Sequence, residues 1–164
     1  MTQPRIIVGL PTYNSTRYLA ETLAAIQAQT FEDFEWVVSD DHSSDETVAM
    51  VRELGDPRIR LLTHDQGLGL VGNWNACVEA AQAPYTVICN HDDLWHPAFL
   101  ARAMQVLDAQ PEVVDRPGVM AAVAKLLAAE QIGISSIIQP EGHEGETVPI
   151  ILMIHDAPNR AMTR

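Results

Sequence analysis

Three observations predict that this sequence folds as an α/β domain with a mostly parallel sheet. Short apolar runs alternate with segments of helical periodicity from Ile6 to about residue 110. The apolar runs are nearly continuous, as in strands buried on both faces. Each run ends in a polar or proline-containing segment that leads into a helix. The resulting βαβαβαβα order favours parallel strands, right-handed crossovers and helices on both faces of the sheet.

The first unit is a strand at 6–10 followed by a helix. Pro11 is expected to end the strand, and Asn14-Ser-Thr16 offers N-cap residues for the helix. The helix is expected because apolar side chains recur at three- and four-residue spacing: Leu19, Leu23 and Ile26.

The next three units repeat this arrangement. Strands are expected at 35–39, 58–63 and 85–89. The helix after the first of them is expected to begin at Ser44 or Asp45, and the next to span about 73–83. The last helix is expected to begin near Pro97, because proline suits the first turn of a helix.

The pattern changes beyond residue 110, which predicts a second module. The segment 110–118 contains two prolines and a glycine, and an alanine-rich helix is expected at 118–131. Strands at 132–139 and 148–154, joined by an acidic loop at 141–146, complete a predicted βαββ fragment. The predicted domains are therefore 1–112 and 113–164.

Composition restricts the classes of partner. The chain has 164 residues and a formal net charge of −12, which argues against nucleic acid or an anionic membrane as the main partner. No apolar stretch approaches the roughly 20 residues that span a bilayer, and the N-terminus lacks a signal-peptide pattern. Cys77 and Cys89 lie in apolar segments and are expected to be buried free thiols. A cytoplasmic location is therefore expected.

Two acidic pairs follow predicted strands. Asp40 and Asp41 come after the second strand, and Asp92 and Asp93 after the fourth. In an open parallel sheet, ligands bind beyond the carboxyl ends of the strands, where both pairs would lie. Such oxygen ligands suit Mg²⁺ or Mn²⁺, which usually bring phosphates with them. The alternative for Asp92 and Asp93 is that they are solvated acids near a helix N-terminus.

Two other kinds of site are conceivable. His91, Asp93 and His96 could hold zinc, although no third imidazole or thiolate stands at a suitable spacing. Gly67-Leu-Gly-Leu-Val-Gly72 has the G-x-G-x-x-G form of a dinucleotide site. It is separated from its strand by three residues and belongs to the third βα unit, so a flexible loop is the alternative interpretation.

Several spaced motifs resemble the nucleotide-binding half of family-2 glycosyltransferases. They occur in the family's order: Pro11-Thr-Tyr-Asn14, Gln29–Glu35, Ser39–Thr47, Gly72-Asn-Trp-Asn75 and Asp92-Asp-Leu-Trp-His-Pro97. The resemblance implies a Rossmann-like GT-A fold over residues 1–112. It also implies that the domain binds a nucleoside-diphosphate sugar, of the UDP kind or similar, for glycosyl transfer to an acceptor.

The resemblance also implies which residues contact the nucleotide. Tyr13 would stack on the base, and Pro11 beside it would contribute backbone contacts. Asp41 would accept a hydrogen bond from a uracil-type ring N–H. Asn75 matches an asparagine that recurs before the fourth strand of the family.

The second acidic pair corresponds to the metal motif of the family. Asp92 would hold the ribose or the sugar, and Asp93 would ligate Mg²⁺ or Mn²⁺ bridging the diphosphate. The chain departs from the family at residue 90, where many relatives carry an acid and this sequence has Asn90.

From about residue 113 the chain resembles the ACT-type regulatory segment of homoserine dehydrogenases. The resemblance rests on Asp115–Ala121, Ile132–Gln139 and Val148–His155. It implies a partial ferredoxin-like unit, a chimeric chain and an alternative function as an amino-acid-binding regulatory or interaction module. Its unpaired sheet edge would form a homodimer. No general base or acceptor half stands in a matching motif, so whether the chain turns over substrate is left open.

Overall fold

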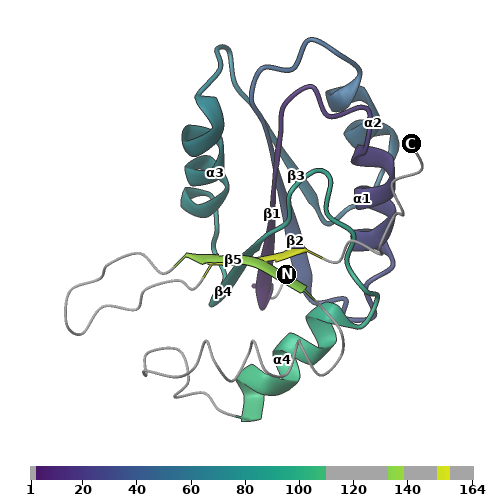
Figure 1. Ribbon diagram of the computed structural model, residues 1–164, viewed down its shortest axis with the longest axis vertical. Helices are drawn as coiled ribbons and strands as arrows, with labels where there is room; N and C mark the ends of the chain where they lie inside the picture. Colours follow the sequence, from purple (N-terminus) through teal and green to yellow (C-terminus); the bar gives the residue numbers. More distant parts are fainter. Residues whose placement is uncertain (1–2, 110–132, 139–150, 156–164) are drawn as a thin grey trace, which may run out of the picture.

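The computed structural model of the chain describes residues 3–109, 133–138 and 151–155 (Figure 1). Its elements in chain order are β1 (Ile6–Thr12), α1 (Leu19–Gln27), β2 (Phe34–Asp40), α2 (Thr47–Glu53), β3 (Ile59–Thr63), α3 (Gly69–Glu79), β4 (Tyr85–Ile88), α4 (Phe99–Ala109), β5 (Gly133–Ile138) and β6 (Ile151–His155). The predicted alternation of strands and helices is confirmed.

The four strands β1 to β4 form one parallel sheet with the order β3-β2-β1-β4. Helix α3 covers one face, and α1 and α2 cover the other (Figure 1). The prediction of a parallel sheet with helices on both faces is therefore confirmed. Because all four strands run the same way, their carboxyl ends share one edge of the sheet.

Strand β1 is longer than the sequence predicts, since it continues through Pro11 to Thr12. Gly9 faces β4, because its carbonyl oxygen accepts the N–H of Cys89 at 2.8 Å. Pro11, two residues on, faces the same side beyond Ile88, the last residue of β4 in the ladder. The missing N–H of the proline therefore costs no ladder hydrogen bond.

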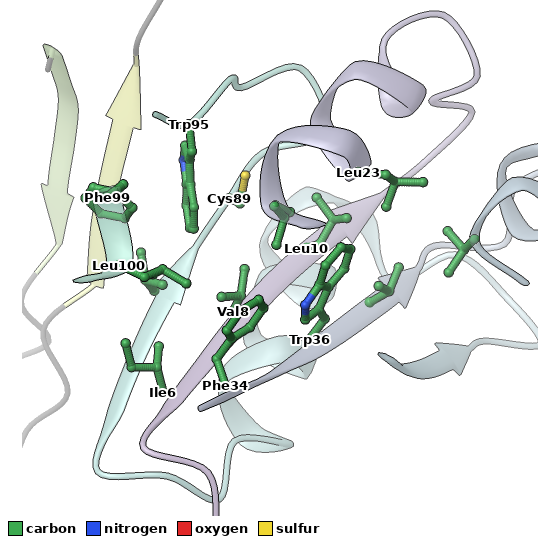
Figure 2. Close-up of a cluster of buried hydrophobic side chains, with 14 of the residues drawn as sticks. Ile6, Val8, Leu10, Leu23, Phe34, Trp36, Cys89, Trp95, Phe99 and Leu100 are labelled. Carbon is green, nitrogen blue, oxygen red and sulfur yellow. The ribbon is translucent and has the colours of Figure 1, made fainter. Parts of the chain in front are cut away.

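The larger hydrophobic core lies between the sheet and the helices α1, α2 and α4 (Figure 2). Alternate residues of β1 and β2 supply its sheet side, as the two-residue period of a strand requires. Trp95 and Phe99 pack edge to face with their ring centroids 4.8 Å apart, and Phe34 stacks on Trp36. The buried members are Ile6, Val8, Leu10, Leu19, Leu23, Ile26, Phe34, Trp36, Val38, Val51, Val87, Cys89, Trp95, Phe99, Leu100 and Met104.

On the opposite face, α3 approaches the sheet closely at Gly9. A Cβ placed on Gly9 would lie 2.6 Å from Ile88 Cδ1 and 2.9 Å from Cys77 Cβ.

We therefore expect Gly9→Ala to lower the free energy of unfolding by about 1–3 kcal/mol through overpacking. Urea unfolding followed by circular dichroism measures this. Gly67→Ala is the matched control, because the nearest atom to its Cβ lies 3.8 Å away; an equal loss in both variants would contradict the packing argument.

Asp56 and Arg58 form an ion pair at the start of β3. The Asp56 carboxylate accepts the Nε–H of Arg58 at 3.0 Å and an Nη2–H at 2.7 Å. The guanidinium also lies over the ring of Phe34, 4.5 Å from its centroid. These bonds from Arg58 hold the pKa of Asp56 below its ordinary value.

We expect Asp56→Asn to make stability less dependent on pH. A lowered folded-state pKa stabilises the fold above the unfolded-state pKa of about 3.9, and this contribution is lost as the pH falls through the folded-state value. The variant should therefore be less stable than the wild type by about 1–2 kcal/mol at neutral pH. The difference should shrink below about pH 4, which urea unfolding across this pH range measures. A difference that stays constant with pH would contradict the assignment.

Strands β5 and β6 pair antiparallel with each other in a separate two-stranded sheet. This confirms the predicted pairing of 132–139 with 148–154. Strand β6 lies beside β4, but among the described strands no ladder joins the two sheets. The predicted helix at 118–131 and loop at 141–146 fall outside the described residues.

Candidate functional site

The loops that follow the four parallel strands lie at the carboxyl edge of the sheet, where the sequence predicts both acidic pairs. The first two are tied together by hydrogen bonds. The backbone N–H of Asn14 donates to Ser43 Oγ, and Asn14 Oδ1 accepts the N–H of Ser44, both at 2.9 Å. Asn14 has a φ of +45°, a left-handed conformation that asparagine adopts more readily than most residues. The loop that carries Tyr13 is thus held against the loop that carries Asp41.

Asp40 is buried and accepts three hydrogen bonds from protein donors. Its carboxylate accepts the hydroxyls of Thr12 at 3.1 Å and Ser43 at 2.6 Å, and the backbone N–H of Ser43 at 2.9 Å. With 2% of its surface exposed, it joins the ends of β1 and β2. The expectation that both acidic pairs line one oxygen-rich site is therefore wrong for Asp40, whose role is to close the loop.

Asp41 is also buried, and it contacts the start of α3. Its carboxylate accepts the backbone N–H groups of Leu68 and of Gly69, the latter at 3.0 Å. These amides belong to the group that a helix N-terminus leaves without intrahelical partners. Asp41 thus caps α3 from a distant loop.

This cap corrects two predictions about Gly67–Gly72. The helix begins at Gly69, not near residue 73, and its last residues fall short of the predicted end. Glycine is a poor helix former, so the sequence places the start too late. Gly69 has a φ of +74°, which a side chain would strain. The segment is a capped helix start, not the flexible loop that the sequence suggests.

Asp92 and Asp93 are adjacent in one turn but differ in burial. Asp93 is 2% exposed, and its Oδ2 accepts the side-chain amide of Asn90 at 3.0 Å and the backbone N–H of Asn90 at 3.2 Å. Asp92 is exposed. The departure at Asn90 has a physical reason here, because a carboxylate at that position could not donate this hydrogen bond. Thr22 fixes the same turn to α1 by donating to the carbonyl of His91 at 2.9 Å.

The zinc interpretation finds no support. Within the part of the chain that the structure describes, no three histidine, cysteine or acidic side chains come together as a metal-binding group. His96 instead lies just before α4, with its Nδ1 accepting the N–H of Ala98 at 3.1 Å.

Tyr13 and Pro11, both predicted to contact a nucleotide, lie at the end of β1. Tyr13 is 59% exposed directly beyond the strand, and its backbone N–H donates to Ser15 Oγ at 3.0 Å. Pro11 is buried within the strand. An exposed aromatic ring at a ligand-binding edge offers a stacking surface.

The sequence motif Gly72-Asn-Trp-Asn75 directs attention to Asn75, but the structure emphasises Asn73. Asn75 is exposed on α3, whereas Asn73 is 3% exposed and its Nδ2 donates to the carbonyl of Thr12 at 3.1 Å. Residues two apart on a helix do not share a face, while Asn73 and the buried Cys77, four apart, do. That spacing is the signal that could have identified Asn73.

Both cysteines are buried and free, as predicted. Burial raises the pKa of the Cys77 thiol to about 12 and that of Cys89 well above its ordinary value. Neither is a thiolate nucleophile at neutral pH.

Residues 7–128 match the family model described as Glycosyl transferase family 2. The chain belongs to this family. The match runs past the predicted domain boundary at 112, and the resemblance of the C-terminal segment to ACT domains receives no support. The same holds for the amino-acid effector, the homodimer and the chimeric origin that followed from it.

Curated relatives include two bacterial glucosyltransferases. One is the UDP-Glc:alpha-D-GlcNAc-diphosphoundecaprenol beta-1,3-glucosyltransferase WfgD of Escherichia coli, 33% identical over 55% of this chain and 36% of the relative. The other is the GalNAc(5)-diNAcBac-PP-undecaprenol beta-1,3-glucosyltransferase of Campylobacter jejuni, 34% identical over 62% of this chain and 34% of the relative. The chain spans about a third of the length of these proteins.

Solved structures show the same fold. TarS residues 1–349 of S. aureus in complex with UDP-GlcNAc superimposes with a TM-score of 0.62 and 26% identity, over 65% of this chain and 32% of that one. The mannosyltransferase PcManGT of Pyrobaculum calidifontis, in complex with GDP-Man and Mn²⁺, gives a TM-score of 0.58 and 30% identity over 65% and 33%. The α/β fold with its parallel sheet is thus consistent with GT-A. None of the described helices is long and apolar enough to cross a membrane.

Proposed function

We propose that this domain binds a nucleoside-diphosphate sugar with a divalent metal and supplies the donor side of glycosyl transfer. The observation that carries the proposal is that an exposed aromatic residue, Tyr13, and an exposed carboxylate, Asp92, follow the neighbouring strands β1 and β4 at one edge of the sheet. Family membership and the nucleotide complexes of the structural neighbours support it.

The base end of the proposed site is formed by the loops after β1 and β2. Tyr13 would stack on the base, with Pro11 beneath it in β1. Asp41 has two carboxylate oxygens with about four acceptor positions, of which the amides of Leu68 and Gly69 use two. It can therefore accept a ring N–H of the base while it caps α3. The exposed Asn75 on α3 is an additional candidate contact.

The diphosphate end would lie at the turn of residues 90–93. Carboxylate oxygens suit Mg²⁺ or Mn²⁺, and phosphate oxygens and water would complete the coordination, because the described residues offer no group of three acidic, histidine or cysteine ligands. The exposure of Asp92 favours it as the metal ligand over Asp93, whose buried carboxylate holds Asn90. The metal would stabilise the charge that develops on the departing nucleoside diphosphate.

Isothermal titration with UDP and with GDP, at saturating Mn²⁺, tests this function. We expect Tyr13→Ala to weaken binding of the preferred nucleotide at least about fivefold, because stacking on an aromatic ring contributes about 1–3 kcal/mol per base. Tyr13→Phe is the matched control, since it keeps the ring and should bind like the wild type. Absence of binding of either nucleotide by the wild type would contradict the proposed function.

A further inference from the structure

We propose that Asn73 is a positioning residue for the base end of the site. It would hold the end of β1 so that Tyr13 and Asp41 keep their relative placement. This inference rests on the proposed function, since it names a residue that acts through the two side chains proposed to contact the base.

The carbonyl oxygen of Thr12 is the point where three elements join. It accepts the backbone N–H of Asp41 at 2.9 Å and the Nδ2 of Asn73 at 3.1 Å. Thr12 directly precedes Tyr13 and is itself 1% exposed. One buried carbonyl therefore connects the last residue of β1, the first residue after β2 and the second turn of α3.

A second contact links Asp41 directly to α3. The Asp41 carboxylate accepts the amides of Leu68 and Gly69 at the start of the helix, while its own N–H donates to Thr12. Displacement of α3 would therefore move Asp41 through its carboxylate and the end of β1 through Asn73. The positions of Tyr13 and Asp41, the two candidate base contacts, therefore both depend on α3.

The chemistry of Asn73 fits positioning better than stability. Its Oδ1 is buried and finds no hydrogen-bond partner among the described residues. A buried unpaired amide oxygen costs more than one neutral hydrogen bond returns. The Thr12 carbonyl would also keep a donor, the Asp41 N–H, if Asn73 were absent. An apolar residue of similar size at position 73 would thus pack at least as well. Only a hydrogen-bond donor at this position, however, can tie the Thr12 carbonyl to α3.

The test compares Asn73→Leu and Asn73→Ala with Cys77→Ala. Cys77 is the matched control, because it is buried on the same face of α3 one turn further along. We expect both Asn73 variants to bind UDP or GDP, whichever the wild type prefers, about threefold to tenfold more weakly at saturating Mn²⁺, the effect of one hydrogen bond. The control should stay within about twofold of the wild type. The second Asn73 variant keeps the comparison intact if the first does not fold.

A double-mutant cycle with Tyr13→Ala separates positioning from general loosening of the fold. Because Asn73 would act through both Tyr13 and Asp41, Asn73→Leu should lose part of its effect on affinity when Tyr13 is already alanine. Additive losses in the double variant, or unchanged affinity in both single Asn73 variants, would overturn the inference.

Amide hydrogen exchange gives a readout without ligand. Asn73→Leu should accelerate exchange of the Asp41 amide, which donates to Thr12, and leave the Cys89 amide, which donates to Gly9, unchanged. If the wild type binds neither nucleotide, the proposed function fails, and exchange alone then decides on Asn73. Unchanged exchange at Asp41 would overturn the positioning role, and acceleration confined to this junction would support it.

Discussion

Asp40→Ala is expected to lower the free energy of unfolding by about 2–4 kcal/mol, because it removes a buried acceptor from three hydrogen bonds. Those bonds come from the hydroxyls of Thr12 and Ser43 and from the backbone N–H of Ser43. The N–H of Ser43 has no other acceptor in the described structure, and it would be left unpaired close to the end of the sheet. Urea unfolding followed by circular dichroism measures the loss.

Two further variants test this explanation. Asp33→Ala removes an exposed carboxylate at the opposite end of β2 and should change stability by no more than about 0.5 kcal/mol. Asp40→Asn keeps the shape and one acceptor oxygen but presents an NH₂ group to donors, so its stability should lie between those of the wild type and Asp40→Ala. The explanation fails if Asp40→Ala is as stable as Asp33→Ala.

The fold was predictable because its signals are local. Continuous apolar runs mark strands buried on both faces, and their alternation with periodic helices admits few topologies. Residues 6–12 show where prediction from local signals fails. The strand was expected to end at Pro11, but a proline ends a strand only where the neighbouring strand would accept a hydrogen bond from the backbone N–H that proline lacks. Only the register with β4, which ends at Ile88, answers this.

The sequence predicted where the candidate site residues lie at the sheet edge, but not which groups each of them contacts. Asp40, Asp41 and Asp93 look alike in the sequence as acids after strands. The structure separates them by long-range partners, namely Thr12 and Ser43 for Asp40 and the start of α3 for Asp41. Asn73 was missed for the same reason, because its partner Thr12 lies 61 positions away along the chain.

The C-terminal segment shows that a predicted strand pairing can be confirmed while the family resemblance drawn from the same residues receives no support. The pairing of β5 with β6 was predicted from alternation of side chains, and the structure confirms it. That pairing does not support the resemblance to ACT domains, because a two-stranded antiparallel sheet occurs in many folds. The glycosyltransferase match continues through residue 128, across the boundary that the ACT interpretation needed.

Asp92→Asn is expected to abolish most of the gain in nucleotide affinity that Mn²⁺ provides. In the wild type, Asp92 would hold the metal, whose positive charge would favour the diphosphate, so UDP or GDP should bind more tightly at saturating Mn²⁺ than in EDTA. Loss of the exposed carboxylate should reduce this gain at least about tenfold, equivalent to ~1.4 kcal/mol. Paired isothermal titrations with and without the metal measure it for each variant.

Asp93→Asn is the decisive comparison, since it removes a charge from the adjacent residue. The buried carboxylate of Asp93 accepts two hydrogen bonds from Asn90. Both bonds go to Oδ2, so the amide oxygen of Asp93→Asn can still accept them, but without the negative charge they are weaker and this variant should lose about 1 kcal/mol of stability. It should nevertheless keep the Mn²⁺-dependent gain if Asp92 is the ligand. The reverse pattern, in which Asp93→Asn loses the gain and Asp92→Asn keeps it, would identify Asp93 as the metal ligand. The turn of residues 90–93 would then have to open when the nucleotide binds.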